Sequence, residues 1–181
     1  MNLTISARKR LAAGAAIACL AIGAPTVALA ASSGPLTRPS TPRCNNSNTY
    51  VWFALSPNGA AGTIYYPVEF ANIGSSACTL AGFPGVSAIN KSDHQLGLAA
   101  KRARGVTVHT VTIQPGQTAH AMLGITQAGV IGGCHNTTAF GLKVYPPNEF
   151  TRQLVLRFTF SVCSNKPSMR IYPVTPGIGV P

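Results

Sequence analysis

Residues 64–71, IYYPVEFA, indicate most directly how this chain folds. Two sets of side chains alternate along them: Ile64, Tyr66, Val68 and Phe70 form one set, and Tyr65, Pro67, Glu69 and Ala71 form the other. A period of two is typical of a β-strand that buries one of its faces. Because Pro67 has no N–H to donate to a neighbouring strand, we expect either an edge strand or a bulge at that residue.

Similar short runs of β-branched and aromatic residues recur along the chain between turns rich in Gly, Pro and Asn. The clearest alternation lies at 153–162, where every second residue from Leu154 to Val162 is apolar. We expect further strands at 50–55, 86–90, 95–100, 106–113, 117–125, 138–145 and 168–174. About nine short antiparallel strands without a convincing helix predict an all-β protein, folded as a two-sheet sandwich.

Residues 1–30 have the pattern of a signal peptide. A basic cluster at 8–10 precedes an uncharged apolar run at 11–29, and that run ends in the small-residue sequence Ala-Leu-Ala at 28–30. Signal peptidases cleave after such a sequence. We therefore expect cleavage before Ala31 and an exported protein that is either secreted or associated with the cell wall.

Two other interpretations of this segment stay open. A membrane-spanning helix of this length is conceivable, but Gly14, Gly23 and Pro25 would weaken it. A lipoprotein would carry its lipid on Cys19, but the residues after Cys19 are apolar where a lipoprotein has a polar tether. Cleavage before Ala31 is the interpretation that the sequence favours.

Composition divides the rest of the chain into three parts. Residues 31–43 are rich in Ser, Thr and Pro, and we expect a disordered tether there. Residues 44–177 are long enough to bury one core, and we expect a single folded domain. A short tail follows at 178–181. No segment after the leader is apolar for long enough to cross a bilayer.

Export changes the number of cysteines that matter. Cys19 would leave with the leader, and the four that remain are Cys44, Cys78, Cys134 and Cys163. Four cysteines in an oxidising compartment indicate two disulfides, with three possible pairings.

The positions of turns favour one of these pairings. Antiparallel strands around a turn near 60–61 would bring Cys44 beside Cys78. A second turn, after the Pro-Pro dipeptide of the chain, would bring Cys134 within one residue of Cys163. A bulge or a loose strand end can absorb that offset. We therefore expect one disulfide within each of these two pairs.

The charge of the chain is strongly positive. It carries 14 Lys and Arg residues against 3 Asp and Glu, a net charge of +11. Loss of the basic cluster at 8–10 with the leader leaves 11 basic side chains against 3 acidic ones, a net charge of +8. Such a surface attracts anionic molecules in a salt-dependent way, although solubility alone is a competing explanation. We expect an anionic envelope polymer, a lipid surface or an unidentified protein as the partner, and no nucleic acid.

The densest basic cluster after the leader is AAKRARG, which contains Lys101, Arg102 and Arg104 between two predicted strands. Lysine and arginine side chains bind phosphates and carboxylates, so these three residues are candidate anion-binding residues. The alternative interpretation is a solvated loop.

His109, His120 and Met122 form a second candidate site. If Pro115-Gly116 is the turn of a hairpin, His109 lies opposite Met122 and His120 lies on the same face. Two imidazoles and a thioether could bind copper. The alternative is a pair of exposed histidines beside a methionine that fills space.

Catalytic groups are scarce. The side-chain carboxylates are Glu69, Asp93 and Glu149, and they show no pairing of the kind that acid–base chemistry requires. The adjacent Asp93 and His94 lie in a turn-like segment without the context of a nucleophile. We expect a protein that is not an enzyme and has no cofactor.

Residues 70–86, FANIGSSACTLAGFPGV, resemble the secreted actinobacterial family known as domain of unknown function 4232. The resemblance rests on a Phe-x-Asn strand end, a Gly-Ser turn and the sequence Cys-Thr-Leu-x-Gly-aromatic-Pro-Gly-Val. It continues through Pro115-Gly116, the two later cysteines, Pro146-Pro147 and Pro173-Val174. It implies an exported immunoglobulin-like β-sandwich, often tethered to the envelope, with no assigned reaction and no catalytic residues.

The sequence therefore favours an exported, non-catalytic module that binds a partner through its basic surface. A copper-handling protein that uses the two histidines and the methionine is one alternative. A purely structural domain is the other.

Overall fold

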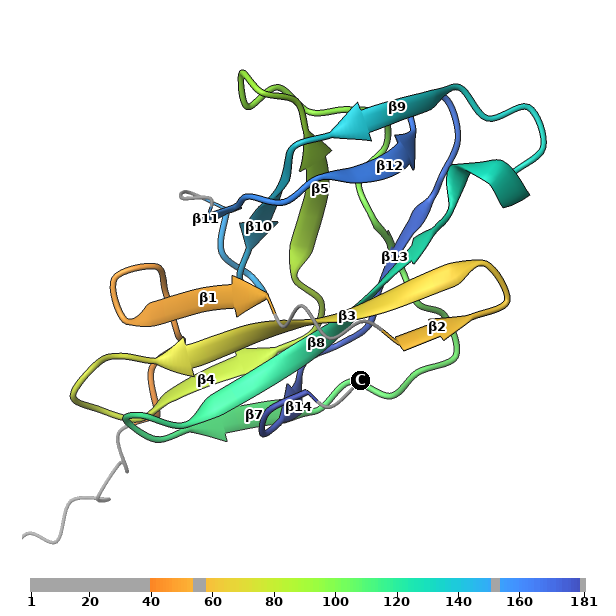
Figure 1. Cartoon of the computed structure of the whole chain (residues 1–181). Coiled ribbons are helices and arrows are strands. Elements are labelled where there is room, and N and C mark those ends of the chain that lie inside the picture. Colours follow the sequence, from red (N-terminus) through yellow and green to blue (C-terminus); the bar gives the residue numbers. More distant parts are fainter. Residues whose placement is uncertain (1–39, 54–57, 151–153, 180–181) are drawn as a thin grey trace, which may run out of the picture. The chain divides into compact units, whose positions relative to one another are not determined.

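The computed structural model describes residues 40–53, 58–150 and 154–179, which fold almost entirely into β-strands (Figure 1). The strands are β1 (Thr49–Phe53), β2 (Asn58–Ala60), β3 (Thr63–Asn72), β4 (Cys78–Ala81), β5 (Gly85–Ile89), β6 (Lys101–Arg102), β7 (Thr110–Ile113), β8 (Thr118–Thr126), β9 (Asn136–Ala139), β10 (Gly141–Tyr145), β11 (Leu154–Leu156), β12 (Phe160–Cys163), β13 (Met169–Ile171) and β14 (Thr175–Pro176). Within these ranges the single helical element is one 3-10 turn, η1 (Ala128–Val130). The predicted all-β class is confirmed.

The largest sheet is built around β3 and β8. Its strand order is β1-β3-β8-β13-β6, and β2 pairs with β3 while β14 pairs with β8. The ladder between β3 and β8 extends from Thr63 opposite Thr126 to Ala71 opposite Thr118. One face of these strands enters the core, where Phe70 and Leu123 are fully buried, whereas the other face is partly open.

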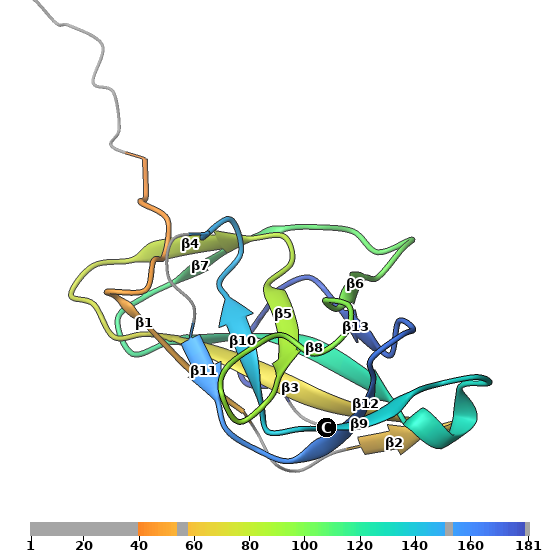
Figure 2. The same ribbon diagram turned by 90° about the horizontal axis from the view of Figure 1, so that it is seen from above.

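Three smaller sheets complete the sandwich, with strand orders β11-β10-β5, β12-β9 and β4-β7. Figures 1 and 2 show β5 and β10 running across one face of the largest sheet. Their buried side chains Val86 and Leu142 belong to the same core cluster as Phe70 and Leu123. A two-sheet core of this kind is what the alternating patterns predict.

The strand at 64–71 forms as predicted, but it is central rather than at an edge. β3 pairs with β8 on one side and with β1 and β2 on the other. On the side of β3 that pairs with β1 and β2, the ladder with β1 ends at Val68 and the ladder with β2 ends at Tyr65. Pro67 lies in the gap between these two ladders and has no register partner there among the described residues. The missing N–H of Pro67 therefore removes no ladder hydrogen bond among the described residues.

The predicted continuous strand at 153–162 is wrong, because a bulge divides it. Leu156 pairs with Leu142, whereas Phe160 pairs with Ala139, so the later strand contains one extra residue between the two ladders. Gly141 lies at this point, and a Cβ on it would lie 2.5 Å from the carbonyl oxygen of Leu156. The close approach of the two backbones therefore requires glycine.

Three further expectations about the strands are wrong. The sheets contain fourteen described strands rather than about nine, and one pair, β6 with β13, is parallel. The chain does turn at Pro115-Gly116, where the N–H of Gln117 donates to Gln114 O. The strands on either side do not form a hairpin, however, because β7 pairs with β4 and β8 pairs with β3.

Both predicted disulfides are present. Cys44 is bonded to Cys78 with their Cα atoms 4.9 Å apart, and Cys134 is bonded to Cys163 with their Cα atoms 5.4 Å apart. The turn argument holds for the first pair, because β1 and β3 are antiparallel with Phe53 opposite Val68.

The predicted leader at 1–30 and most of the tether at 31–43 lie outside the described residues. The last residues of the expected tether belong to the fold, because Pro42 O accepts a hydrogen bond from the N–H of Thr79 and Arg43 bridges to Thr79. Across the described ranges, no helix has both the length and the apolar character to span a membrane.

Removing either disulfide should destabilise the domain by a similar amount. The two bonds close rings with sequence separations of 34 and 29 residues. Loops of this size correspond to about 3–4 kcal/mol in the chain-entropy model. We expect the Cys44→Ser/Cys78→Ser and the Cys134→Ser/Cys163→Ser proteins to lose free energies of unfolding within about 1 kcal/mol of each other, measured by urea denaturation. A loss confined to one of the two pairs would contradict this expectation.

Candidate anion-binding site

The basic cluster that the sequence singles out does not form one patch. Lys101 lies beside Arg170 in the parallel pair of β6 and β13. Arg102 points the other way, as successive strand residues do, and its guanidinium lies 5.7 Å from the centre of the Phe83 ring. Arg104 is exposed beyond the end of β6. Of the three residues in the cluster, Lys101 is therefore the one that shares a site with another cation, Arg170.

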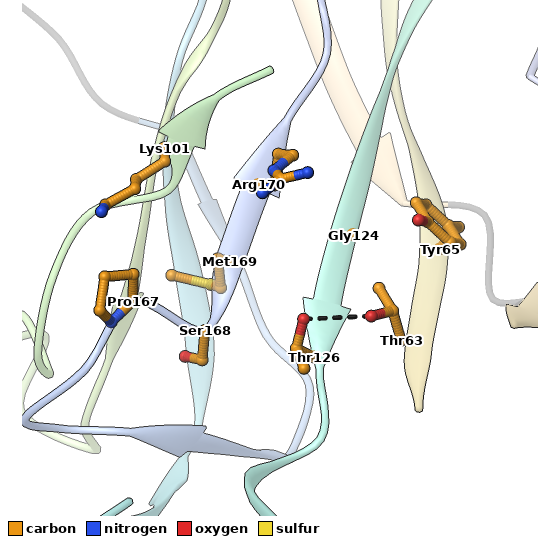
Figure 3. A pocket seen from close by; sticks show the side chains of 9 residues that line it. All are labelled: Thr63, Tyr65, Lys101, Gly124, Thr126, Pro167, Ser168, Met169 and Arg170. Carbon is orange, nitrogen blue, oxygen red and sulfur yellow. Dashed lines mark hydrogen bonds between the residues drawn. The ribbon is translucent and has the colours of Figure 1, made fainter. Parts of the chain in front are cut away.

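Four strands of the largest sheet contribute one residue each to a row across its outer face. Tyr65 of β3 is opposite Gly124 of β8, Gly124 is opposite Arg170 of β13, and Arg170 is opposite Lys101 of β6. Figure 3 shows Arg170 and Lys101 on one side of Gly124 and Tyr65 on the other.

Gly124, at the centre of this row, lets the neighbouring Tyr65 and Thr63 side chains pack closely against β8. A Cβ at Gly124 would lie 3.0 Å from Cε1 of Tyr65 and 3.2 Å from Cγ2 of Thr63, so a larger residue would displace the tyrosine ring. A groove lies beside this row of residues, and we call it the cationic groove. Its volume is about 250 Å³. Its lining is formed by Thr63, Tyr65, Lys101, Gly124, Thr126, Pro167, Ser168, Met169 and Arg170.

Hydroxyl groups also line the groove. The hydroxyls of Thr63 and Thr126 lie 3.1 Å apart in a hydrogen bond, and the Ser168 hydroxyl accepts from the N–H of Cys163 at 3.3 Å. Partial burial raises the pKa of Tyr65, the neighbouring Tyr172 raises it further, and Arg170 opposes the shift. The Tyr65 phenol therefore stays protonated at neutral pH and can donate a hydrogen bond.

No carboxylate lines the cationic groove among the described residues, although all three side-chain carboxylates of the protein lie within them. Asp93 forms an ion pair with Arg157, and Glu149 accepts a hydrogen bond from the N–H of Phe150. Glu69 is buried elsewhere on the sheet. The groove thus combines two cations with hydroxyl groups, which is a suitable set of partners for phosphate or carboxylate oxygens.

The structure does not assemble the proposed copper ligands. The hairpin that would place His109 opposite Met122 is absent, and His109 is exposed just before β7. Both ring nitrogens of His120 are engaged, since Nδ1 lies 3.0 Å from Gly177 O and Nε2 lies 3.0 Å from Oγ1 of Thr175. Within the described residues, no group of three or more His, Cys, Asp or Glu side chains is arranged to hold a metal.

Glu69 is a buried acid that the sequence pattern placed on the exposed face of β3. Its side chain is fully buried, because the chain after β14 folds over it. Oε1 accepts a hydrogen bond of 2.8 Å from the N–H of Gly179, while Oε2 has no hydrogen-bond partner among the described residues. A Cβ on Gly179 would lie 2.4 Å from Cβ of Pro67, so glycine is needed for this close packing. Burial raises the pKa of Glu69, and the Gly179 N–H and His120 reduce that rise.

The raised pKa makes the stability of the fold depend on pH. In the unfolded chain Glu69 ionises near a pKa of about 4.3, whereas the folded protein holds its proton to higher pH. Folding is therefore progressively disfavoured as the pH rises from about 4 through the folded-state pKa. A Glu69→Gln variant cannot ionise, so its free energy of unfolding should increase relative to that of the wild type between pH 4 and pH 7.5.

Urea denaturation at both pH values measures this difference. Glu149→Gln is a suitable control, because it removes the same charge from a side chain that is partly exposed. A Glu69→Gln difference that is constant with pH would contradict the assignment of Glu69 as the buried acid.

Comparison with known proteins identifies a family, and that family is one of unknown function. No curated protein matches the chain. The model of one family, described as a domain of unknown function (DUF4232), matches residues 44–175, which is most of the chain and includes both disulfides and the cationic groove. The protein therefore belongs to the DUF4232 family.

Proposed function

We propose that this protein is an exported, non-catalytic module of the cell envelope that binds phosphate or carboxylate groups of an anionic partner in the cationic groove. The observation that carries the proposal is the parallel pairing of β6 with β13, which places Lys101 and Arg170 side by side. Arg170, Gly124 and Tyr65 follow one another in the same row, and all three line the cationic groove.

Two features support binding rather than charge that serves only solubility. The hydroxyls of Thr63, Thr126 and Tyr65 line the same groove as the cations and can donate hydrogen bonds to an anion. No acidic side chain in the described lining competes for Lys101 or Arg170. An evenly spread solubilising charge would need neither arrangement.

Export is part of the proposal on separate grounds. The basic, apolar and small-residue segments of 1–30 are those of a signal peptide. Two disulfides are typical of proteins that fold in an oxidising compartment. In that setting the anionic partner is an envelope polymer or lipid rather than nucleic acid, and a protein partner with an acidic surface is the remaining alternative.

A pair of double variants with equal charge tests the site. Lys101→Ala/Arg170→Ala removes two cations from the groove, whereas Lys91→Ala/Arg104→Ala removes two exposed cations outside its lining. With inorganic polyphosphate as the probe, we expect the first protein to bind at least about tenfold more weakly than the wild type, since charge-assisted hydrogen bonds contribute about 1.5–3 kcal/mol each. The second should change affinity about twofold or less.

Isothermal titration calorimetry at two salt concentrations measures both effects. Affinity for polyphosphate should fall as the salt concentration rises. Equal losses in the two double variants would mean that the whole basic surface attracts the probe, and the groove would then not be the site.

A further inference from the structure

A second hollow lies on the same face of the largest sheet, beside the cationic groove. It has a volume of about 370 Å³ and shares Tyr65 with the groove. We call it the apolar cleft, and it is lined by Tyr65, Val106, Thr107, Met122, Tyr172, Pro173 and Thr175. Most of these side chains present carbon atoms, and the Thr175 hydroxyl is already engaged with His120.

Strand geometry places the two hollows in neighbouring rows. Arg170 and Tyr172 are two residues apart along one chain segment, and the N–H of Tyr172 donates to Met122 O. Met122 and Gly124 are likewise two residues apart on β8. Two residues of a strand span about 7 Å. An anionic group bound at Arg170 and an apolar group bound in the cleft can therefore belong to one small molecule.

Two tyrosines flank the cleft. The ring centres of Tyr65 and Tyr172 lie 6.4 Å apart, and the rings are tilted by 55°. Tilted rings do not form the flat platform on which a sugar ring stacks. A sugar would also need several hydrogen-bond partners for its hydroxyls, and in the cleft the Thr175 hydroxyl is engaged with His120 while the Tyr65 and Tyr172 side chains interact with each other.

We propose that the groove and the cleft form one site for an amphipathic anion. Its phosphate lies between Lys101 and Arg170, and its alkyl or prenyl chain lies over Met122 against the Tyr65 and Tyr172 pair. This inference rests on the proposed function and narrows it, because it assigns the anionic group to a lipid-like molecule rather than to a soluble polymer.

The length of the alkyl chain provides the test. Inorganic phosphate and the butyl, hexyl and octyl phosphates, all below their micelle concentrations, are titrated into the purified protein and followed by calorimetry. Each methylene buried in the cleft should tighten binding by up to about fourfold, until the cleft is filled. Octyl glucoside has a similar chain without the charge, and it should bind much more weakly than octyl phosphate.

Variants separate the two halves of the site. Met122→Gln should abolish the dependence on chain length and leave the affinity for inorganic phosphate unchanged. Val108→Gln is the matched control, because Val108 is 45% exposed and does not line the cleft. Lys101→Ala/Arg170→Ala should weaken every phosphate compound and bring octyl phosphate down to the affinity of octyl glucoside.

The wild-type protein gives an independent readout. In amide NMR spectra, octyl phosphate should shift the signals of Thr107, Met122 and Tyr172, and inorganic phosphate should not. If phosphate and polyphosphate bind through Lys101 and Arg170 without any gain from the chain, this inference is overturned and the proposed function stands. If neither binds at the groove, the proposed function itself fails. Equal affinities for octyl phosphate and octyl glucoside would overturn the amphipathic site.

Discussion

The antiparallel ladder between β3 and β8 is the constraint on which the rest of the fold depends. It runs from Thr63 opposite Thr126 to Ala71 opposite Thr118. The register decides which side chains enter the core, because a shift of one residue would turn Phe70 and Leu123 outward. The same register decides the outer face, where it brings Tyr65 opposite Gly124. The core and the candidate site thus lie on opposite faces of the same pair of strands.

One end of the outer face of this ladder is covered by another segment of the chain, and the other end is open. At one end the chain after β14 folds over Glu69 and engages His120. At the other end the cationic groove and the apolar cleft stay open. Glycine allows a close contact at each end, since Gly179 fits against Pro67 and Gly124 lets the Tyr65 ring pack against β8 at the edge of the groove. At both positions a larger side chain would push the neighbouring group away from the sheet.

Local patterns predicted the parts of this structure that depend on neighbouring residues. The alternation at 64–71, the turn at Pro115-Gly116 and the closure of each disulfide around a turn all follow from short-range spacing. The pairing of strands after that turn did not follow, because turn chemistry fixes a reversal of the chain but not the sheet that the next strand joins. The hairpin, and with it the pairing of His109 with Met122, was wrong for this reason.

The candidate site needed information that no local pattern contains. Lys101 was identified as part of a basic cluster, but Arg170 is far away in the sequence and joins it through a parallel pair only two residues long. Glu69 was placed on an open face because alternation describes the strand and not the segment that later covers it. The alternation of Met169, Arg170 and Ile171 was the signal that could have shown Arg170 to face outward.

The two disulfides also determine how the domain would respond to mechanical force. If the chain were pulled from both ends, tension would pass from Cys44 directly to Cys78 and from Cys134 directly to Cys163. The segments inside these two covalent loops, which include β1, β3, β10 and β11, would carry no tension. From Cys44 onward, extension would be confined to the chain between the loops and after Cys163, which contains β8 and β13. The domain could then be stretched only by a limited length before covalent bonds resist.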